Sequence, residues 1–479
     1  MKLKRTLALT LILTLLLSLF CGCEKKETQK KKVSSKPKEK TASEIYRQAN
    51  ELLDTLDARE MVQRVKANLT IGATTAEFKI DDTMVAFLED GKYKSYYRKN
   101  DVTVFSVYET LSYSYVDGVY YYSDDEQKYR QNMTPEEFKK SEDEGTITYE
   151  MDYFEKVSVS GKKAKTITYS KPKEKNLKDL TEAFDSIITG FFDDGDITDM
   201  SGKLVTDENG ILLNETLTIN GLAHSDGQLG DFTLEFSMER TKTGDEVPEI
   251  FAPAEADKFK EVSDIEAVLS LPGLAANMIT LDKTKYTLEH ITSIEGRGIN
   301  ATINRKAEVE YTFDIENATI NTYSVKYDTN TANNKWWDTS ETSPIVSGNS
   351  SYDGNKLIVN GRLLNTKPSK EELAAVYTAF VFPSIPPVGS IIDAKSEKTG
   401  KGTKITYTAT AEAYEEWAKI VLATEGLVPD SIEDLGGGKS YIVVDENDSV
   451  VSVKIQKSFM IEINGESLIY RINLTRTNK

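Results

Sequence analysis

The sequence predicts an α+β protein made of two tandem domains, each an antiparallel sheet with helices on one face. Two observations carry this prediction. Segments of one half recur in the same order in the other half at a nearly constant spacing, which is the mark of an internal repeat. Within each half, short alternating apolar segments separated by turn residues are interrupted by helical patterns, which is typical of an α+β domain.

The repeat is carried by short matching segments with shared turn chemistry. The matching pairs are SGKKAKTITYS with TGKGTKITYT, VTDENGILL with VVDENDSVV, FTLEFSMERTK with SLIYRINLTRTN, and, more weakly, YVDGVYYY with YDGNKLIV. The first pair leads in each copy into a helical pattern with a single apolar face. That face carries Leu177, Leu180 and Phe184 in one copy, and Tyr414, Trp417 and Val421 in the other.

The elements of the first copy follow from periodicity and turn residues. An amphipathic helix is expected over 45–56, and helices are expected again over 135–141, opened by proline, and 176–188. Strands are expected between them, with a hairpin turn on Asp117-Gly118. The expected strands are 77–80, 83–88, 92–97, 102–108, 112–115 and 119–123.

The domain limits follow from the repeat and from composition. We expect a signal peptide over 1–22, a lysine-rich disordered tether over 23–41, one domain over 42–261 and the second over 262–479. The boundary lies in 244–262, which has two prolines and no sustained strand alternation.

The N-terminus resembles a bacterial lipoprotein signal. Three positive charges in MKLKR precede an apolar run over 7–20 that is shorter than the roughly 20 residues that cross a bilayer. The only two cysteines follow, and the small Gly22 before Cys23 fits the cleavage site of such signals, although Phe20 departs from the usual leucine. The resemblance implies that Cys23 becomes the lipid-bearing first residue of a protein on the extracytoplasmic face of the cell membrane. An ordinary cleaved signal with a stray thiol is the alternative.

Charge is distributed unevenly along the chain, whose formal net charge is −18. Residues 24–40 hold eight lysines and three glutamates, which places a basic tether beside anionic headgroups next to the anchor. The remainder is acidic, and this argues against nucleic acid as a partner, because nucleic-acid binding needs a basic surface.

No pattern of residues indicates catalysis or a metal site. The chain lacks G-x-S-x-G, a P-loop and H-E-x-x-H, and it has only two histidines. The acidic run 193–196 does not follow the spacing of a calcium loop. We therefore expect a non-catalytic protein without a cofactor or metal.

The layout of each half, with the hairpin YVDGVYYY and the domain end VPEIFAP, resembles the lipoprotein-carrier-like superfamily. That superfamily includes LolA-type carriers, mycobacterial LppX/LprG-type lipoproteins and Gram-positive lipoproteins of unassigned role. The resemblance implies a strongly curved antiparallel half barrel with helices on its concave face. It also implies that a lipid or other amphipathic ligand binds between the sheet and the helices.

Two alternatives remain open at this point. The apolar stripes that would line a ligand cavity could equally close into a filled core. A non-catalytic tandem protein could also act as a two-domain interaction or scaffold module that docks an envelope protein or cell-wall partner.

Aromatic residues supply the candidate ligand contacts. Tyr120 and Tyr122 belong to a dense tyrosine cluster, which either lines a groove or stabilises the sheet through cross-strand pairs. Trp336 and Trp337 are adjacent, so on a strand one ring would face the covered side and the other would be exposed. Packing within the fold and contact with a ligand or partner are both open for this pair.

Overall fold

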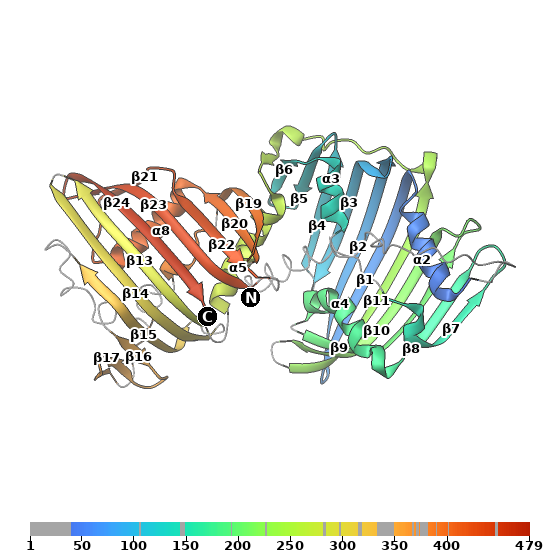
Figure 1. Ribbon diagram of the computed structural model, residues 1–479, viewed down its shortest axis with the longest axis horizontal. Coiled ribbons are helices and arrows are strands. Elements are labelled where there is room, and N and C mark those ends of the chain that lie inside the picture. Colours follow the sequence, from blue (N-terminus) through green and yellow to red (C-terminus); the bar gives the residue numbers. More distant parts are fainter. Residues whose placement is uncertain are drawn as a thin grey trace. The chain divides into compact units, whose positions relative to one another are not determined.

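The computed structural model describes residues 40–479, apart from gaps at 105–106, 144–148, 193, 226–227, 281–283, 297, 315–318, 333–348, 366–367, 370–372, 374–381, 389, 401 and 446–448. The chain forms two compact units, unit 1 ending at Glu261 and unit 2 beginning at Val262 (Figure 1). Each is described here by itself. Among the described residues, no helix is long and apolar enough to cross a membrane.

Unit 1 is built on one twelve-stranded sheet. Its helices and strands are α2 (Ala42–Leu53), β1 (Ala58–Ile71), β2 (Thr74–Glu89), β3 (Lys92–Val104), β4 (Val107–Val116), β5 (Val119–Ser123), β6 (Lys128–Asn132), α3 (Pro135–Asp143), β7 (Phe154–Ser160), β8 (Thr166–Pro172), α4 (Leu177–Phe191), β9 (Asp194–Thr206), β10 (Leu212–Ser225), β11 (Gln228–Thr243) and β12 (Lys260–Glu261). The strands lie in the order β12-β6-β5-β4-β3-β2-β1-β11-β10-β9-β8-β7. Neighbours are antiparallel except for β12, which runs parallel to β6. The sheet is open, because β12 and β7 lie at its two edges.

The middle of this sheet joins the two ends of the unit. The first strand, β1, pairs with the last long strand, β11, from Arg59 opposite Thr243 to Thr70 opposite Asp231. It pairs on its other side with β2 along its whole length. The long central strands therefore depend on contacts between residues far apart in the sequence.

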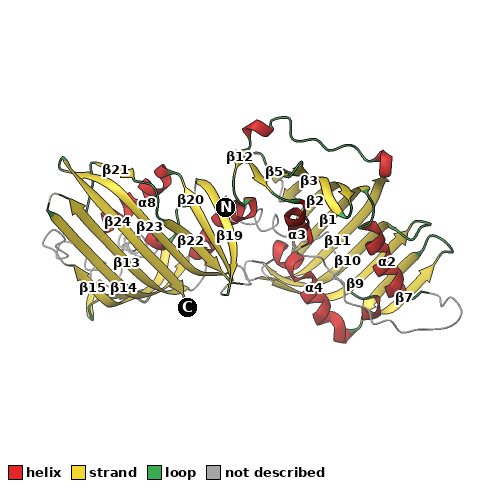
Figure 2. Cartoon of the chain, turned by 45° about the horizontal axis from the view of Figure 1, so that its top comes forward, coloured by secondary structure: helices red, strands yellow, loops and turns green. Residues whose placement is uncertain are grey.

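The helices of unit 1 lie on one face of the sheet, which we call the covered face (Figures 1 and 2). Helix α3 begins with a capping box, in which the Thr134 hydroxyl accepts from the Glu137 amide at 3.2 Å and the Glu137 carboxylate accepts from the Thr134 amide at 2.8 Å. Its Phe138 ring is fully buried. That ring stacks on Tyr115 at 4.4 Å between centroids and lies 5.2 Å from Tyr96 of β3. Aromatic packing thus fixes α3 on the sheet.

The strands of the unit 2 sheet follow the order of those in unit 1, except that the edge strand β12 has no counterpart among the described strands. Its elements are α5 (Ile265–Thr280), β13 (Thr284–Gly296), β14 (Ile299–Asp314), β15 (Thr319–Ala332), β16 (Ser350–Tyr352), β17 (Leu357–Val359), β18 (Arg362–Asn365), β19 (Ile391–Thr399), β20 (Gly402–Ala409), α8 (Ala411–Thr424), β21 (Ser431–Asp434), β22 (Lys439–Val444), β23 (Val450–Ile463) and β24 (Glu466–Asn478). The order is β18-β17-β16-β15-β14-β13-β24-β23-β22-β20-β19, with β21 paired to β23 beside this path. Here β13 pairs with the last strand, β24, as β1 pairs with β11 in unit 1.

The expected helices are present with shifted ends. The helix expected over 45–56 runs from Ala42 to Leu53, because Thr41 forms a capping box with Glu44. The face predicted for α8 is confirmed, since Tyr414, Trp417 and Val421 are all buried.

The hairpin turn predicted at residues 117–118 is confirmed as well. Asp117 and Gly118 both have positive φ, at 52° and 80°, as a tight two-residue hairpin turn requires. Val116 and Val119 pair directly across this turn.

The expected strands of unit 1 were too short. The segments 77–80 and 83–88 form one strand, β2, and 92–97 continues through 104 as β3. The strand β1 was not predicted at all. These three errors have one physical cause, because polar side chains are buried in the middle of these strands. The strand expected over 102–108 is wrong in another way, because its residues divide between the end of β3 and the start of β4.

Candidate functional site

A row of polar side chains crosses the covered face of unit 1. Gln63 of β1 lies opposite Asp82 of β2, and Asp82 lies opposite Asn100 of β3. Strand alternation puts Asn100 on the same face as Arg98 and Tyr96, and Tyr96 contacts α3 through Phe138. Gln63, Asp82, Arg98 and Asn100, which we call the unit 1 polar row, are each at most 2% exposed.

The charged members of the row form a buried ion pair. Arg98 donates from Nε to Asp82 Oδ2 at 3.0 Å, and its Nη2 lies 2.8 Å from the same oxygen. Burial raises the pKa of Asp82, although Arg98 acts to lower it. Glu142 of α3 is buried too, and its charge acts on Arg98 and Tyr96. Burying these charges costs free energy that their mutual attraction only partly offsets.

The uncharged members of the row lack hydrogen-bond partners. Among the described residues, nothing pairs with either amide atom of the Gln63 or Asn100 side chains. The same holds for the hydroxyls of Tyr96 and of Tyr113, which lies opposite Arg98 on β4. Burial raises the pKa of both phenols, so both remain protonated donors at neutral pH. Each buried group left unpaired costs about 1–3 kcal/mol.

The surroundings of the row are apolar. On one side lie buried aliphatic residues such as Val65, Ile80 and Val102. Farther along β2 is Phe78, which packs on Phe191 of α4 at 5.7 Å. On the other side lie the tyrosines packed around Phe138. The covered face therefore has a polar band between two apolar regions, and such a band suits a molecule that is itself partly polar and partly apolar.

Unit 2 has a second buried polar row, which contains a histidine. His290 of β13 lies opposite Arg305 of β14. Burial and the adjacent Arg305 lower the pKa of His290 to about 3, so its imidazole is neutral at physiological pH. No described residue pairs with His290 Nε2 or with Arg305 Nε.

A carboxylate from α8 completes this unit 2 row. Glu425 follows the last residue of α8 and is buried. It accepts from the Thr292 hydroxyl at 2.7 Å and from the Tyr470 hydroxyl at 3.0 Å, and one oxygen lies 3.5 Å from Arg305 Nη1. Burial raises the pKa of Glu425, while Arg305 and the two hydroxyls act to lower it.

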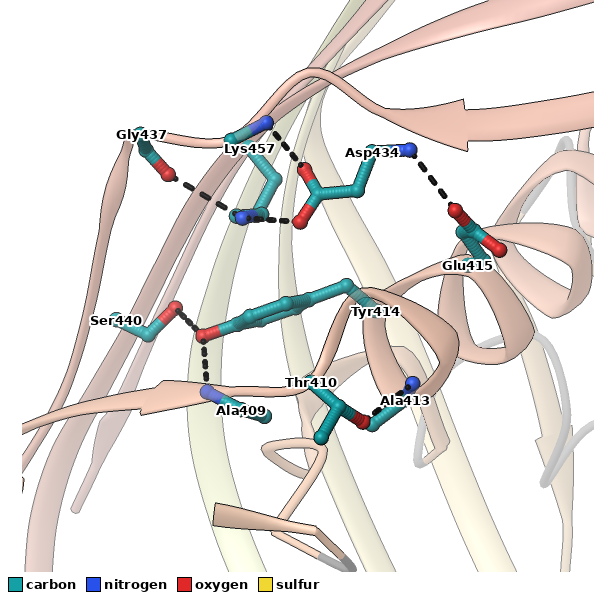
Figure 3. Close-up of polar contacts among 10 residues, drawn as sticks. Ala409, Thr410, Ala413, Tyr414, Glu415, Asp434, Gly437, Ser440 and Lys457 are labelled. Atoms are coloured by element: carbon teal, nitrogen blue, oxygen red, sulfur yellow. Dashed lines mark hydrogen bonds and ion pairs between the residues drawn. The ribbon is translucent and has the colours of Figure 1, made fainter. Parts of the chain in front are cut away.

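A further set of contacts fastens α8 at its other end (Figure 3). Tyr414 donates to the Ser440 hydroxyl at 3.0 Å, and the buried Lys457 pairs with Asp434 at 2.7 Å. Lys457 also donates to the Gly437 carbonyl at 3.2 Å and lies 4.0 Å from the centre of the Tyr414 ring. These groups satisfy one another, so this cluster positions α8 and β21.

Two of the predicted contact residues lie beside the unit 1 polar row. Tyr120 packs against Phe138 at 5.6 Å, and Tyr122 packs against Tyr113 at 5.4 Å. Both rings are buried, and the Tyr122 hydroxyl donates to Asp124 at 2.8 Å. Their role as ligand contacts stays a prediction.

The other predicted site residues, Cys23, Trp336 and Trp337, lie outside the described residues. Sequence reasoning missed the polar row itself. The available signal was the break in strand alternation at each of its members.

No metal site accompanies the row in the part of the chain that the structure describes. No group of acidic, histidine or cysteine side chains there could hold a metal ion. A surface pocket of about 400 Å³ lies at the start of α3, lined by residues that include Gly118, Met133 and Glu137. It is separate from the polar row.

The Glu425 contacts give a stability prediction. Replacing Glu425 by Leu leaves Arg305 buried without a counter-charge, and we expect a loss of about 3–5 kcal/mol in the unfolding free energy. The double variant Glu425→Leu/Arg305→Met removes both charges and should recover most of that loss. Urea unfolding of the full chain measures both.

The exposed Glu416 on the same helix provides the control, because Glu416→Leu should change stability by no more than about 0.5 kcal/mol. An unchanged urea midpoint for Glu425→Leu would contradict the role given to this carboxylate.

Comparison with known proteins leaves the family open. No family model matches the chain, and no curated protein matches it. Among solved structures, LprF from Mycobacterium bovis is similar to this chain at 9% identity and a TM-score of 0.24. The match covers 44% of this chain and 96% of LprF. Rv2717c from M. tuberculosis covers 40% of this chain over 96% of its length, at 10% identity and a TM-score of 0.14. MucB in complex with MucA(peri) matches 92% of this chain and 94% of its own length, at 8% identity and a TM-score of 0.17. At such scores none of these likenesses carries an argument about function, which must come from the chain's own residues.

Proposed function

We propose that this chain is a membrane-anchored, extracytoplasmic lipoprotein that binds a lipid or other amphipathic molecule beneath a curved sheet, without catalysing a reaction. The proposal includes two tandem copies of one lipoprotein-carrier-like domain. The common strand order of the two sheets supports this duplication. The matching hairpins support it too, because the segments paired in the sequence lie at the β7–β8 and β19–β20 turns.

The observation that carries the binding proposal is the unit 1 polar row. A core that served stability alone would be apolar there, because an apolar residue at Gln63 or Asn100 would avoid the cost of an unpaired amide. An amphipathic ligand would supply the hydrogen-bond partners that the row lacks among the described residues. Its polar part can pair with the amides, while its apolar part lies along the aliphatic and aromatic residues on either side.

The side chains of the row are not suited to act as a nucleophile, general acid or general base, and this supports a binding role. Asp82 is neutralised by Arg98, and the amides of Gln63 and Asn100 are neither nucleophiles nor acids. Arginine stays protonated in proteins and is no general base. These groups can hold and orient a ligand.

Co-purifying ligand tests the binding proposal. The full chain, purified from the membranes of its own host, should release a lipid or another amphipathic molecule on organic extraction. Native mass spectrometry should show the same mass bound to the chain without a covalent bond. The delipidated chain should take up a fluorescent fatty acid. If the chain carries no such molecule and takes up no fatty acid, the proposal fails.

The anchor has its own test. If Cys23 carries the lipid, Cys23→Ser should move the protein from the membrane fraction to the soluble fraction, because the remaining basic tether binds membranes weakly and reversibly. Cys21→Ser, two residues away, is the matched control and should leave the protein in the membrane. A Cys23→Ser protein that still sediments with membranes in high salt would contradict the anchor.

A further inference from the structure

The two polar rows occupy the same place in the two sheets. Aligning Arg240 of β11 with Arg476 of β24, as the repeated segments FTLEFSMERTK and SLIYRINLTRTN do, brings Met238 level with Leu474. Gln63 pairs with Met238, and His290 pairs with Leu474. In this alignment of the repeated segments, Gln63 and His290 are equivalent.

Their neighbours on the next strand are equivalent in turn. Asp82 lies opposite Gln63, and Arg305 lies opposite His290. The charge at this position is thus acidic in unit 1 and basic in unit 2.

The counter-charges come from different elements. Asp82 is paired with Arg98 of the neighbouring strand, so this pair lies within the sheet. Arg305 is paired with Glu425, which reaches the sheet from the end of α8. In unit 2 the carboxylate at the end of α8 thus accepts hydrogen bonds at the centre of the row. In unit 1 the covering helix α3 also brings a carboxylate, Glu142, which is buried near Arg98 and Tyr96.

Hydrogen bonding differs at the centres of the two rows, although His290 Nε2 and Arg305 Nε of unit 2 also have no partner among the described residues. Glu425 accepts from Thr292 and Tyr470 as well as lying beside Arg305, so a carboxylate of the chain itself already fills the centre of the unit 2 row. In unit 1 the Gln63 and Asn100 amides have no partner among the described residues. The N–H donors and the C=O acceptor of each amide are therefore available for hydrogen bonds to a ligand.

We infer that the amphipathic ligand binds in unit 1 alone, with its polar part against Gln63 and Asn100, and that Glu425 takes the equivalent place in unit 2. This inference rests on the proposed function and adds to it the site and the chemistry of recognition. The polar part of the ligand must both donate and accept hydrogen bonds, because each amide offers an N–H and a C=O. Unit 2 then serves as a permanently closed copy.

Matched substitutions at equivalent positions test this inference. Gln63→Leu and His290→Leu both replace a buried polar side chain by an apolar one at the same place in the two sheets. Asn68→Leu changes a half-buried amide of β1 on the opposite face of the sheet and is the control. Each variant of the delipidated full chain is titrated with 11-(dansylamino)undecanamide, whose primary amide both donates and accepts hydrogen bonds, and native mass spectrometry counts the bound probe molecules.

We expect one probe molecule per wild-type chain. Gln63→Leu should raise the Kd about tenfold or more, since two hydrogen bonds to the ligand are lost. Asn100→Leu should act in the same direction. His290→Leu and Asn68→Leu should leave the Kd within about twofold of the wild type.

Thermal unfolding separates lost binding from lost folding. Removing an unpaired buried amide should leave the Tm of ligand-free Gln63→Leu at or above that of the wild type. A lowered Tm together with weakened binding would show that Gln63 acts through the fold, and would overturn its assignment as a ligand contact.

Stoichiometry separates this inference from the proposed function. Two probe molecules per chain, or weakened binding in His290→Leu with normal binding in Gln63→Leu, would overturn the assignment to unit 1 while leaving a binding protein. No uptake by the wild-type chain would overturn the proposed function itself.

Discussion

The ion pair between Asp82 and Arg98 lies in the middle of β2 and β3 of unit 1, and the arrangement of the covered face depends on how its charges and amides are satisfied. Removing two charges from water costs several kcal/mol per ion, and the pair recovers that cost only with good geometry and further hydrogen bonds. An apolar substitute would do as well for stability. A buried row that is more polar than the fold needs is the observation behind the proposed binding function.

Unit 2 solves the same problem with its own residues. The carboxylate of Glu425 gives Arg305, Thr292 and Tyr470 a common acceptor. It does so from the end of α8, whose start is held by the contacts of Tyr414 and of the Lys457–Asp434 pair. Hydrogen bonds and ion pairs therefore join α8 to the sheet of unit 2 at both ends of the helix. In unit 1 aromatic rings pack α3 on the sheet, and this contrast gives a physical reason for the different roles proposed for the two units.

The sequence predicted the helices better than the strands, and the reason is local. Proline opens α3 and Thr41 caps α2, so these helices carry their signals within a few residues. Strands were read from alternation, which assumes that polar side chains face solvent. That assumption fails at Gln63, Asp82 and Asn100, which hid β1, divided β2 and shortened β3. These three errors fall on members of the unit 1 polar row, so in these strands the failure of the pattern marked the candidate site. The partners of these residues come from pairing between distant strands, and no local pattern contains that information.

A crystal structure of the full chain, purified from its host without removal of lipid, tests the central claim most directly. We predict density for an amphipathic molecule on the covered face of unit 1, with its polar atoms about 2.7–3.2 Å from the side-chain amides of Gln63 and Asn100. A structure in which those amides are paired only with protein groups or ordered water, and the aliphatic and aromatic residues around them pack against one another, would contradict the account.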